Sequence, residues 1–197
     1  KIGVMVNGSE IANPETQISC LKKLFNPKSE SRISLVRIAC HLHEFQNCLP
    51  ASIWLKKKGY KVGFNLMQIA DRSLEEITEL AVAANDYPID VLYFADSMGS
   101  LNSNQLKDIT NAFRNGWKKD LGIHAHDNTG QAVNNSIQAI NFGINWVDST
   151  VTGMGRGSGN AQTEYVILGL SNFRKNQGSI VKLLKLIDEH FKPMKES

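Results

Sequence analysis

Six short runs of β-branched and other apolar residues recur along the chain, with helical patterns between them. The starts of these runs lie roughly 25–32 residues apart. The runs occupy residues 1–7, 33–40, 60–67, 90–96, 120–126 and 145–151. A regular alternation of strand and helix at this spacing predicts an α/β fold, with a parallel sheet and helical crossover connections.

Helical signals fill the segments between the runs. Ser73 and Glu76 form a capping-box pattern, which predicts a helix that continues through Ala84. Asn13 and Pro14 are expected to open an earlier helix, as its N-cap and its first-turn proline. Three of the helices show apolar stripes, formed by Ile18, Leu21 and Leu24, by Leu106, Ile109 and Phe113, and by Val133, Ile137 and Ile140.

The strands themselves decide between an open sheet and a closed barrel. Central strands of an open, doubly covered sheet are apolar throughout, whereas these strands alternate. One face carries Val36, Ile38, Cys40, Leu121, Ile123 and Ala125, and the other carries Arg37, Ala39, His41, Gly122, His124 and His126. In the last run, Asp148 and Thr150 lie on one face of the strand, and Val147, Ser149 and Val151 lie on the other. An apolar face for outer helices and a polar face for a lumen predict a TIM (β/α)8 barrel, with its chemistry at the C-terminal ends of the strands.

Only about six βα units are present, whereas a closed barrel of this kind needs about eight. The chain starts in mid-strand at Lys1, so the first two units are expected to be missing. We therefore interpret residues 1–197 as a single, partial barrel domain. Open parallel edges tend to aggregate, which predicts that the chain alone is poorly soluble or that it is read from a longer product.

Composition narrows the class of protein. The chain is 42% hydrophobic and 21% charged, as is usual for a globular protein, and its net charge of +3 is too small to indicate nucleic acid or a membrane surface as a partner. Cys20, Cys40 and Cys48 form no CxxC motif, which favours reduced thiols in a cytoplasmic protein. The sequence shows neither a signal peptide nor an apolar stretch of spanning length.

The segment GIHAHDNTGQ carries the clearest candidate chemistry. Residues i and i+2 of a strand point the same way, so His124 and His126 are expected to face the lumen about 6–7 Å apart. Their imidazoles can then converge on one metal ion. The alternative is a pair of interior histidines that only form hydrogen bonds.

The region HAHDNTGQAVNNSIQAINFGINWVDSTVTGMGRGSGNAQTE resembles the signature region of the barrel metallolyases, the DRE-TIM or HMG-CoA lyase-like family. This family includes 4-hydroxy-2-oxovalerate aldolase, 3-hydroxy-3-methylglutaryl-CoA lyase and the 2-isopropylmalate synthases. VRIACH, VGFNLM and YFADSMG resemble the fourth, fifth and sixth strands of the 2-oxo acid aldolases. The resemblance covers nearly all of residues 1–170 and is closest to the aldolase branch.

The resemblance implies a divalent metal, Mn²⁺, Mg²⁺ or Co²⁺, bound by His124 and His126. Asn160 matches a third ligand of the lyase and synthase branches, and its alternative role is the N-cap of a helix that starts at Ala161. Asp127 and Asn128 are expected to support the ligands or to form a turn.

Substrate binding is assigned to residues at the mouth of the predicted barrel. These residues are Asn65, Gln68, Ser97, Thr150 and Arg156. Gln68 replaces a serine of the aldolases, which leaves the substrate contacts there open. The alternative role of Asp96 and Ser97, which we favour slightly, is helix capping in the next turn. The glycine-rich loop at 152–160, with Arg156, could hold an anion on its backbone N–H groups or be a plain tight turn.

A second cluster joins Cys40, His41 and His43 with Cys48. Cysteine and histidine together suggest zinc, but this spacing fits no common zinc finger. We favour His41 as a catalytic or substrate-binding residue at the lumen mouth.

The family's first strand carries an Arg-Asp pair, in which the Asp is a metal ligand and the Arg stabilises the enolate. The sequence contains no such segment. The catalytic histidine that follows this strand in the aldolases and their C-terminal communication domain are also missing. The resemblance still implies a metal-dependent aldol lyase that converts a 4-hydroxy-2-oxo acid into pyruvate and an aldehyde, with turnover expected from a full-length protein rather than from these residues alone. The alternatives are an acyl-CoA condensing or cleaving enzyme and a non-catalytic remnant of the fold. The expected partner is a small 2-oxo acid, and a homo-oligomer is left open.

Overall fold

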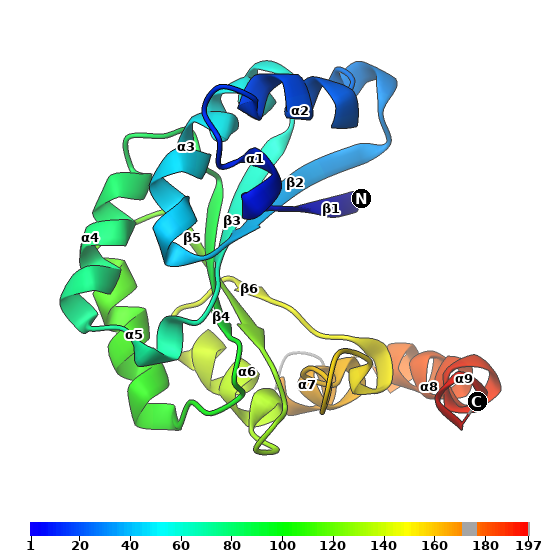
Figure 1. Ribbon diagram of the computed structural model, residues 1–197. Coiled ribbons are helices and arrows are strands. Elements are labelled where there is room, and N and C mark those ends of the chain that lie inside the picture. Colours follow the sequence, from blue (N-terminus) through cyan, green and yellow to red (C-terminus); the bar gives the residue numbers. More distant parts are fainter. Residues whose placement is uncertain (171–176, 197) are drawn as a thin grey trace.

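The computed structural model describes residues 1–170 and 177–196, and it builds them around one curved parallel sheet (Figure 1). The six strands follow one another in the order β1-β2-β3-β4-β5-β6. Their bounds are β1 Ile2–Asn7, β2 Ile33–Cys40, β3 Lys61–Leu66, β4 Val91–Asp96, β5 Asp120–Ala125 and β6 Trp146–Val147. Sequential parallel strands joined by helices are the repeating unit of a (β/α)8 barrel, so the predicted partial barrel is confirmed.

Helices α2 to α6 lie along the convex side of the sheet, whereas α7 to α9 extend away from it as an arm (Figure 1). The helices are α1 Gly8–Ile11, α2 Gln17–Leu24, α3 Leu42–Lys57, α4 Leu74–Ala84, α5 Ser103–Gly116, α6 Ala132–Asn141, α7 Thr163–Gly169, α8 Gln177–Leu186 and α9 Lys192–Glu196. A π-helical turn at Ile187–Phe191 joins α8 to α9. Within the described residues, no helix is both long and apolar enough to cross a membrane.

The hydrophobic core lies between the convex face of the sheet and the helices. Val36, Ile38 and Cys40 of β2 are fully buried in it, together with Phe64 of β3 and Phe45 of α3. In β2 and β5 the predicted division into a helix-facing apolar set and an opposite, more polar set is therefore confirmed.

Two details of the sequence prediction were wrong. The first is the start of α2, which is Gln17 rather than Asn13-Pro14, because the Asn13 side chain accepts from the Glu15 amide and its carbonyl closes a turn. Of the predicted stripe on α2, only Leu21 is fully buried. Ile18 and Leu24 are exposed.

The second concerns the last strand, which is shorter than predicted. β6 holds only Trp146 and Val147, and the chain then leaves the sheet, so that Thr150 pairs with Gln162 in an isolated bridge. The helix predicted around Val133, Ile137 and Ile140 is α6. These three side chains are half-buried, and Val133 packs against the core. The fully buried residues of α6 are Ala132, Asn135, Ser136 and Ala139.

The remaining helix signals agree with the structure. Ser73 is the N-cap of α4, and its hydroxyl accepts a hydrogen bond from the Glu76 amide at 3.1 Å. The predicted α5 stripe of Leu106, Ile109 and Phe113 is buried.

Candidate functional site

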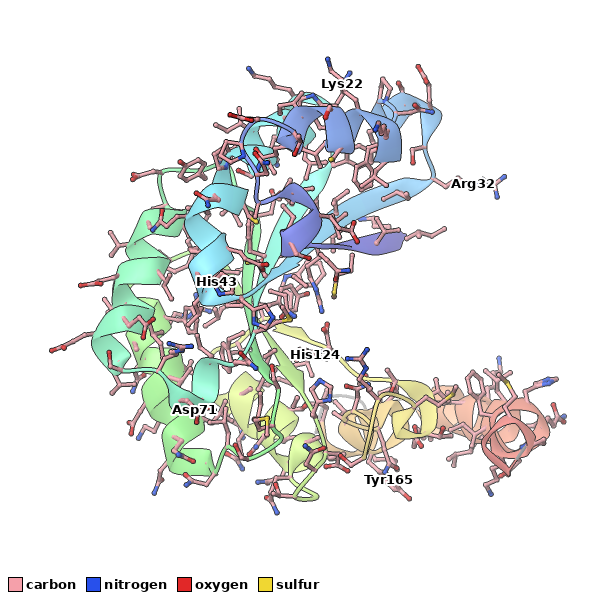
Figure 2. The ribbon with its side chains drawn as sticks, viewed as in Figure 1. Lys22, Arg32, His43, Asp71, His124 and Tyr165 are labelled. Carbon is pink, nitrogen blue, oxygen red and sulfur yellow. The ribbon has the colours of Figure 1, made fainter. Side chains whose placement is uncertain are left out.

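His124 and His126, the two histidines of the segment GIHAHDNTGQ, lie at the C-terminal end of β5. Their ring centroids are 5.0 Å apart, and the ring planes meet at 84°. His124 lies on the concave, open side of the sheet (Figure 2). Burial lowers the pKa of His126, the neighbouring His124 and Arg156 lower it further, and Asp96 opposes them. A lowered pKa keeps this imidazole neutral, which is the form that binds a metal.

The other ring nitrogen of His124 is held by an aspartate from the end of the sheet. His124 Nδ1 lies 2.9 Å from Oδ2 of Asp148, which also pairs with the Arg37 guanidinium from β2. Burial works to raise the pKa of Asp148, but hydrogen bonds from His124 and Arg37 outweigh it and hold the pKa below its usual value. This arrangement leaves Nε2 of His124 as the nitrogen available to an ion.

Asn160 is placed beside the histidines by an antiparallel bridge to His126. Its Nδ2 donates to the Met154 carbonyl at 2.9 Å, whereas its buried Oδ1 has no hydrogen-bond partner among the described residues. Because α7 begins only at Thr163, with Gln162 as its N-cap, the N-cap role of Asn160 is wrong. A buried amide oxygen with no partner fits a metal ligand, since such an oxygen otherwise pays a desolvation cost.

Two imidazoles and one amide oxygen therefore make up the candidate ligand set. Across residues 1–170 and 177–196, no group of three or more His, Cys, Asp or Glu side chains is placed to hold an ion. Mixed nitrogen and oxygen donors suit a catalytic divalent cation that keeps open positions, rather than a closed structural zinc site. His124, His126 and Asn160 would hold such an ion.

Two of the predicted substrate residues lie together where β3 and β4 end. The Gln68 backbone adopts φ 58°, and its N–H donates to the Ser97 hydroxyl at 3.0 Å. Asn65, inside β3, is only 4% exposed, and its Oδ1 has no hydrogen-bond partner among the residues described. Asn65 is thus a buried acceptor on the concave face, in register with Tyr93 of β4.

Asp96 and Asp127 support loops. The Asp96 carboxylate accepts from the amides of Ser100 and Leu101 at 3.0 and 3.1 Å, so it closes the turn that follows β4. The N-cap of α5 is Asn102, so the helix-capping alternative for Asp96 is wrong. Asp127 Oδ1 accepts from the Ala132 amide at the start of α6, at 2.8 Å.

Asn128 connects two loops of the mouth. Its Nδ2 donates to the Met98 carbonyl, and its Oδ1 accepts from the Ser158 hydroxyl. The turn-forming interpretation of this segment therefore agrees with the structure.

The glycine-rich loop is shaped by its contact with Asn160. A Cβ on Gly155 would overlap the Asn160 amide nitrogen, and a Cβ on Gly159 would overlap the Gly153 carbonyl oxygen. The Thr150 hydroxyl donates to the Met154 carbonyl at 2.7 Å, so it ties the loop down. Arg156 is exposed on this loop, and its charge reaches His126.

His41 is the N-cap residue of α3, where its backbone N–H donates to Oε2 of Glu44 at 2.9 Å. Its ring stacks on that of His43, with centroids 5.6 Å apart. Cys40 and Cys48 are both fully buried in the helix-facing core, and the described residues form no separate zinc site here.

Sequence reasoning missed Arg37 and Asp148 as functional candidates. The alternation had placed both on the lumen face, and opposite charges on one lumen face are a signal of pairing. The two residues are 111 positions apart, however, so only the folded sheet shows that they meet.

Known proteins resemble this chain in sequence. The HMGL-like family model matches residues 22–188. The 4-hydroxy-2-oxovalerate aldolase 2 of Nocardia farcinica is 33% identical over 159 residues, which is 81% of this chain and 45% of that protein. The protein of the same name from Rhodococcus opacus is 32% identical over the same shares of the two chains. The chain thus spans about half the length of the curated relatives it matches.

A solved structure shows the same fold. The HMG-CoA lyase of Bacillus subtilis superposes with a TM-score of 0.74, covering 95% of this chain and 69% of that one at 19% identity. On the family match and the shared architecture, the chain belongs to the HMGL-like family.

Proposed function

We propose that residues 1–197 are a single, partial barrel domain that carries the metal site of an aldol lyase, which cleaves a 4-hydroxy-2-oxo acid into pyruvate and an aldehyde. Three observations support the proposal: the His124 and His126 rings lie 5.0 Å apart, a backbone bridge places Asn160 beside His126, and the buried Oδ1 of Asn160 has no hydrogen-bond partner among the described residues. The naming of the relatives as 4-hydroxy-2-oxovalerate aldolases supports the choice of reaction.

When bound, Mn²⁺, Mg²⁺ or Co²⁺ would act as a Lewis acid that stabilises the negative charge of an enolate. The chain's own residues would orient the substrate. Arg156 and the backbone N–H groups of the glycine-rich loop offer positive charge to a carboxylate, and Asn65 offers an acceptor to a substrate hydroxyl. Gln68 and Ser97, joined by a hydrogen bond, form part of the same mouth.

The proposed reaction begins when a base takes the proton of the C4 hydroxyl. The C3–C4 bond then breaks, its electron pair passes into the enolate, and the aldehyde leaves. Return of a proton to C3 gives pyruvate. His41, at the end of β2, is the candidate base that this chain offers.

The test is pyruvate release in a lactate-dehydrogenase-coupled assay. It uses the protein from the complete open reading frame that encodes these residues, with Mn²⁺ and a panel of 4-hydroxy-2-oxo acids. We expect turnover that falls about 10³-fold or more in the His124→Ala/His126→Ala variant, because several kcal/mol of charge stabilisation are lost. His190→Ala is the matched control, since His190 is exposed in the turn at Ile187–Phe191 that joins α8 to α9. Absence of pyruvate, with turnover of acyl-CoA substrates instead, would replace this proposal with the condensing-enzyme alternative.

A further inference from the structure

The concave face of the sheet carries a polar layer directly beside the candidate ligands. Arg37 comes from β2, Tyr93 from β4, and Trp146 and Asp148 from β6 and the residues after it. Alternate strands of a (β/α)8 barrel contribute the side chains of one lumen layer, and branched aliphatic residues usually fill it. Here the layer holds an ion pair and two aromatic rings instead.

A glycine on the intervening strand β5 makes room for the aromatic side chains of this layer. Gly122 of β5 pairs with both Tyr93 and Trp146, and a Cβ on it would overlap the Tyr93 ring. The backbone therefore accommodates the Tyr93 ring at this position.

Arg37 is held on both sides within this layer. Its guanidinium carbon lies 4.1 Å from the centroid of the Tyr93 ring, which makes an edge contact with Trp146 at 6.3 Å. Its two terminal nitrogens bind the two carboxylate oxygens of Asp148, one of them at 2.9 Å. A bidentate pair of this kind fixes the plane of the carboxylate as well as its position.

The fixed carboxylate also contacts His124, through Oδ2 and Nδ1 at 2.9 Å. An ionised carboxylate can only accept hydrogen bonds, so a neutral His124 must donate its proton from Nδ1. Its Nε2 then carries a lone pair that can bind a metal.

We propose that Asp148 is a positioning residue that locks His124 in its Nδ1–H tautomer, and that Arg37 and Tyr93 hold Asp148 in the orientation this requires. The inference rests on the proposed function, because the tautomer matters only if Nε2 binds the ion. It assigns to the Arg37–Asp148 pair a role in ligand geometry as well as in stability.

The experiment compares the wild-type chain with Asp148→Ala and with the double variant Arg37→Met/Asp148→Leu. The double variant leaves no unpaired buried charge and therefore keeps the fold testable if the single variant does not fold. Asp120→Ala is the matched control, because Asp120 accepts a hydrogen bond from the indole of Trp146 at 2.9 Å in the same region and makes no bond to His124. Two readouts are taken, namely the imidazole ¹⁵N spectrum of the metal-free protein and the affinity for Mn²⁺ by calorimetry. His124→Gln identifies the His124 signals.

In the wild-type chain and in Asp120→Ala we expect the Nδ1–H tautomer of His124. In the variants at Asp148 we expect a shift towards the Nε2–H tautomer and a fall in Mn²⁺ affinity of about 10- to 100-fold. An unchanged tautomer and an unchanged affinity in a folded variant at Asp148 would overturn the inference while leaving the metal site intact. If the wild type binds no Mn²⁺ but the tautomer shifts as expected, the metal proposal fails and the positioning role of Asp148 stands.

Discussion

The convex and concave faces of the sheet are built from alternate residues of the same strands, yet they are held together by different interactions. On the convex face, Ile38 and Phe64 are fully buried among helix side chains. On the concave face, Arg37 and Asp148 form an ion pair, and the Oδ1 atom of the buried Asn65 has no hydrogen-bond partner among the described residues. The difference indicates that the convex face supplies most of the stability, whereas the concave face keeps polar groups in place for chemistry.

The strongest test of this comparison uses two neighbours in β3 that point to opposite faces. Phe64→Ala should lower the free energy of unfolding by about 3–5 kcal/mol, because it opens a cavity next to Phe45, whose ring lies 5.5 Å away. Asn65→Ala should change it by less than about 1 kcal/mol, because it removes a buried acceptor that has no hydrogen-bond partner among the described residues. Urea unfolding of both variants measures the difference. Equal losses would show that the two faces contribute alike.

A smaller effect is expected at Gly122. Gly122→Ala should destabilise the chain by about 1–3 kcal/mol, because the added methyl group overlaps the Tyr93 ring and must displace it. Gly3→Ala on β1 is the control, since its Cβ would make an ordinary 3.5 Å contact with Leu35 and should change stability by at most about 0.5 kcal/mol. Thermal unfolding followed by circular dichroism compares the two. A tolerated alanine at 122 would mean that the concave layer is loosely packed.

The smallest effect concerns pH. The pKa of Asp148 is lowered in the folded chain, so its ionised form stabilises the fold above the ordinary carboxyl pKa of about 3.9. This contribution is lost as the pH falls through the lowered pKa. The stability gap between the wild type and Asp148→Asn should therefore stay constant above about pH 5 and shrink below about pH 4. Urea unfolding at a series of pH values measures it, and a gap that widens in acid would contradict the assigned shift.

Much of this comparison could be predicted from the sequence, because the two-residue period of a strand is fixed by backbone geometry. It placed Arg37, His124 and Asp148 on one face and Ile38 and Ile123 on the other. The period does not show how far apart two strands lie in the folded sheet. The contact between Arg37 in β2 and Asp148 just after β6 was therefore missed.

Local signals failed where loop packing decides the outcome. The segment around Asn160 looked like a helix start, but the chain first forms bridges with His126 and Thr150, and α7 begins three residues after Asn160 at Thr163. Asn13 looked like an N-cap for the same reason, although its side chain closes a preceding turn. In both cases a polar residue before a helical pattern serves a turn, and only the tertiary contacts distinguish the two uses.

The central claim is that His124, His126 and Asn160 bind one divalent ion together. Titration of Mn²⁺ into the metal-free chain, followed by calorimetry, tests it most directly. We expect one ion per wild-type chain, no specific binding by His124→Ala/His126→Ala, affinity weakened about 10-fold or more in Asn160→Ala, and unchanged binding by the exposed His43→Ala control. Binding by the double histidine variant with the wild-type stoichiometry and affinity would contradict the claim.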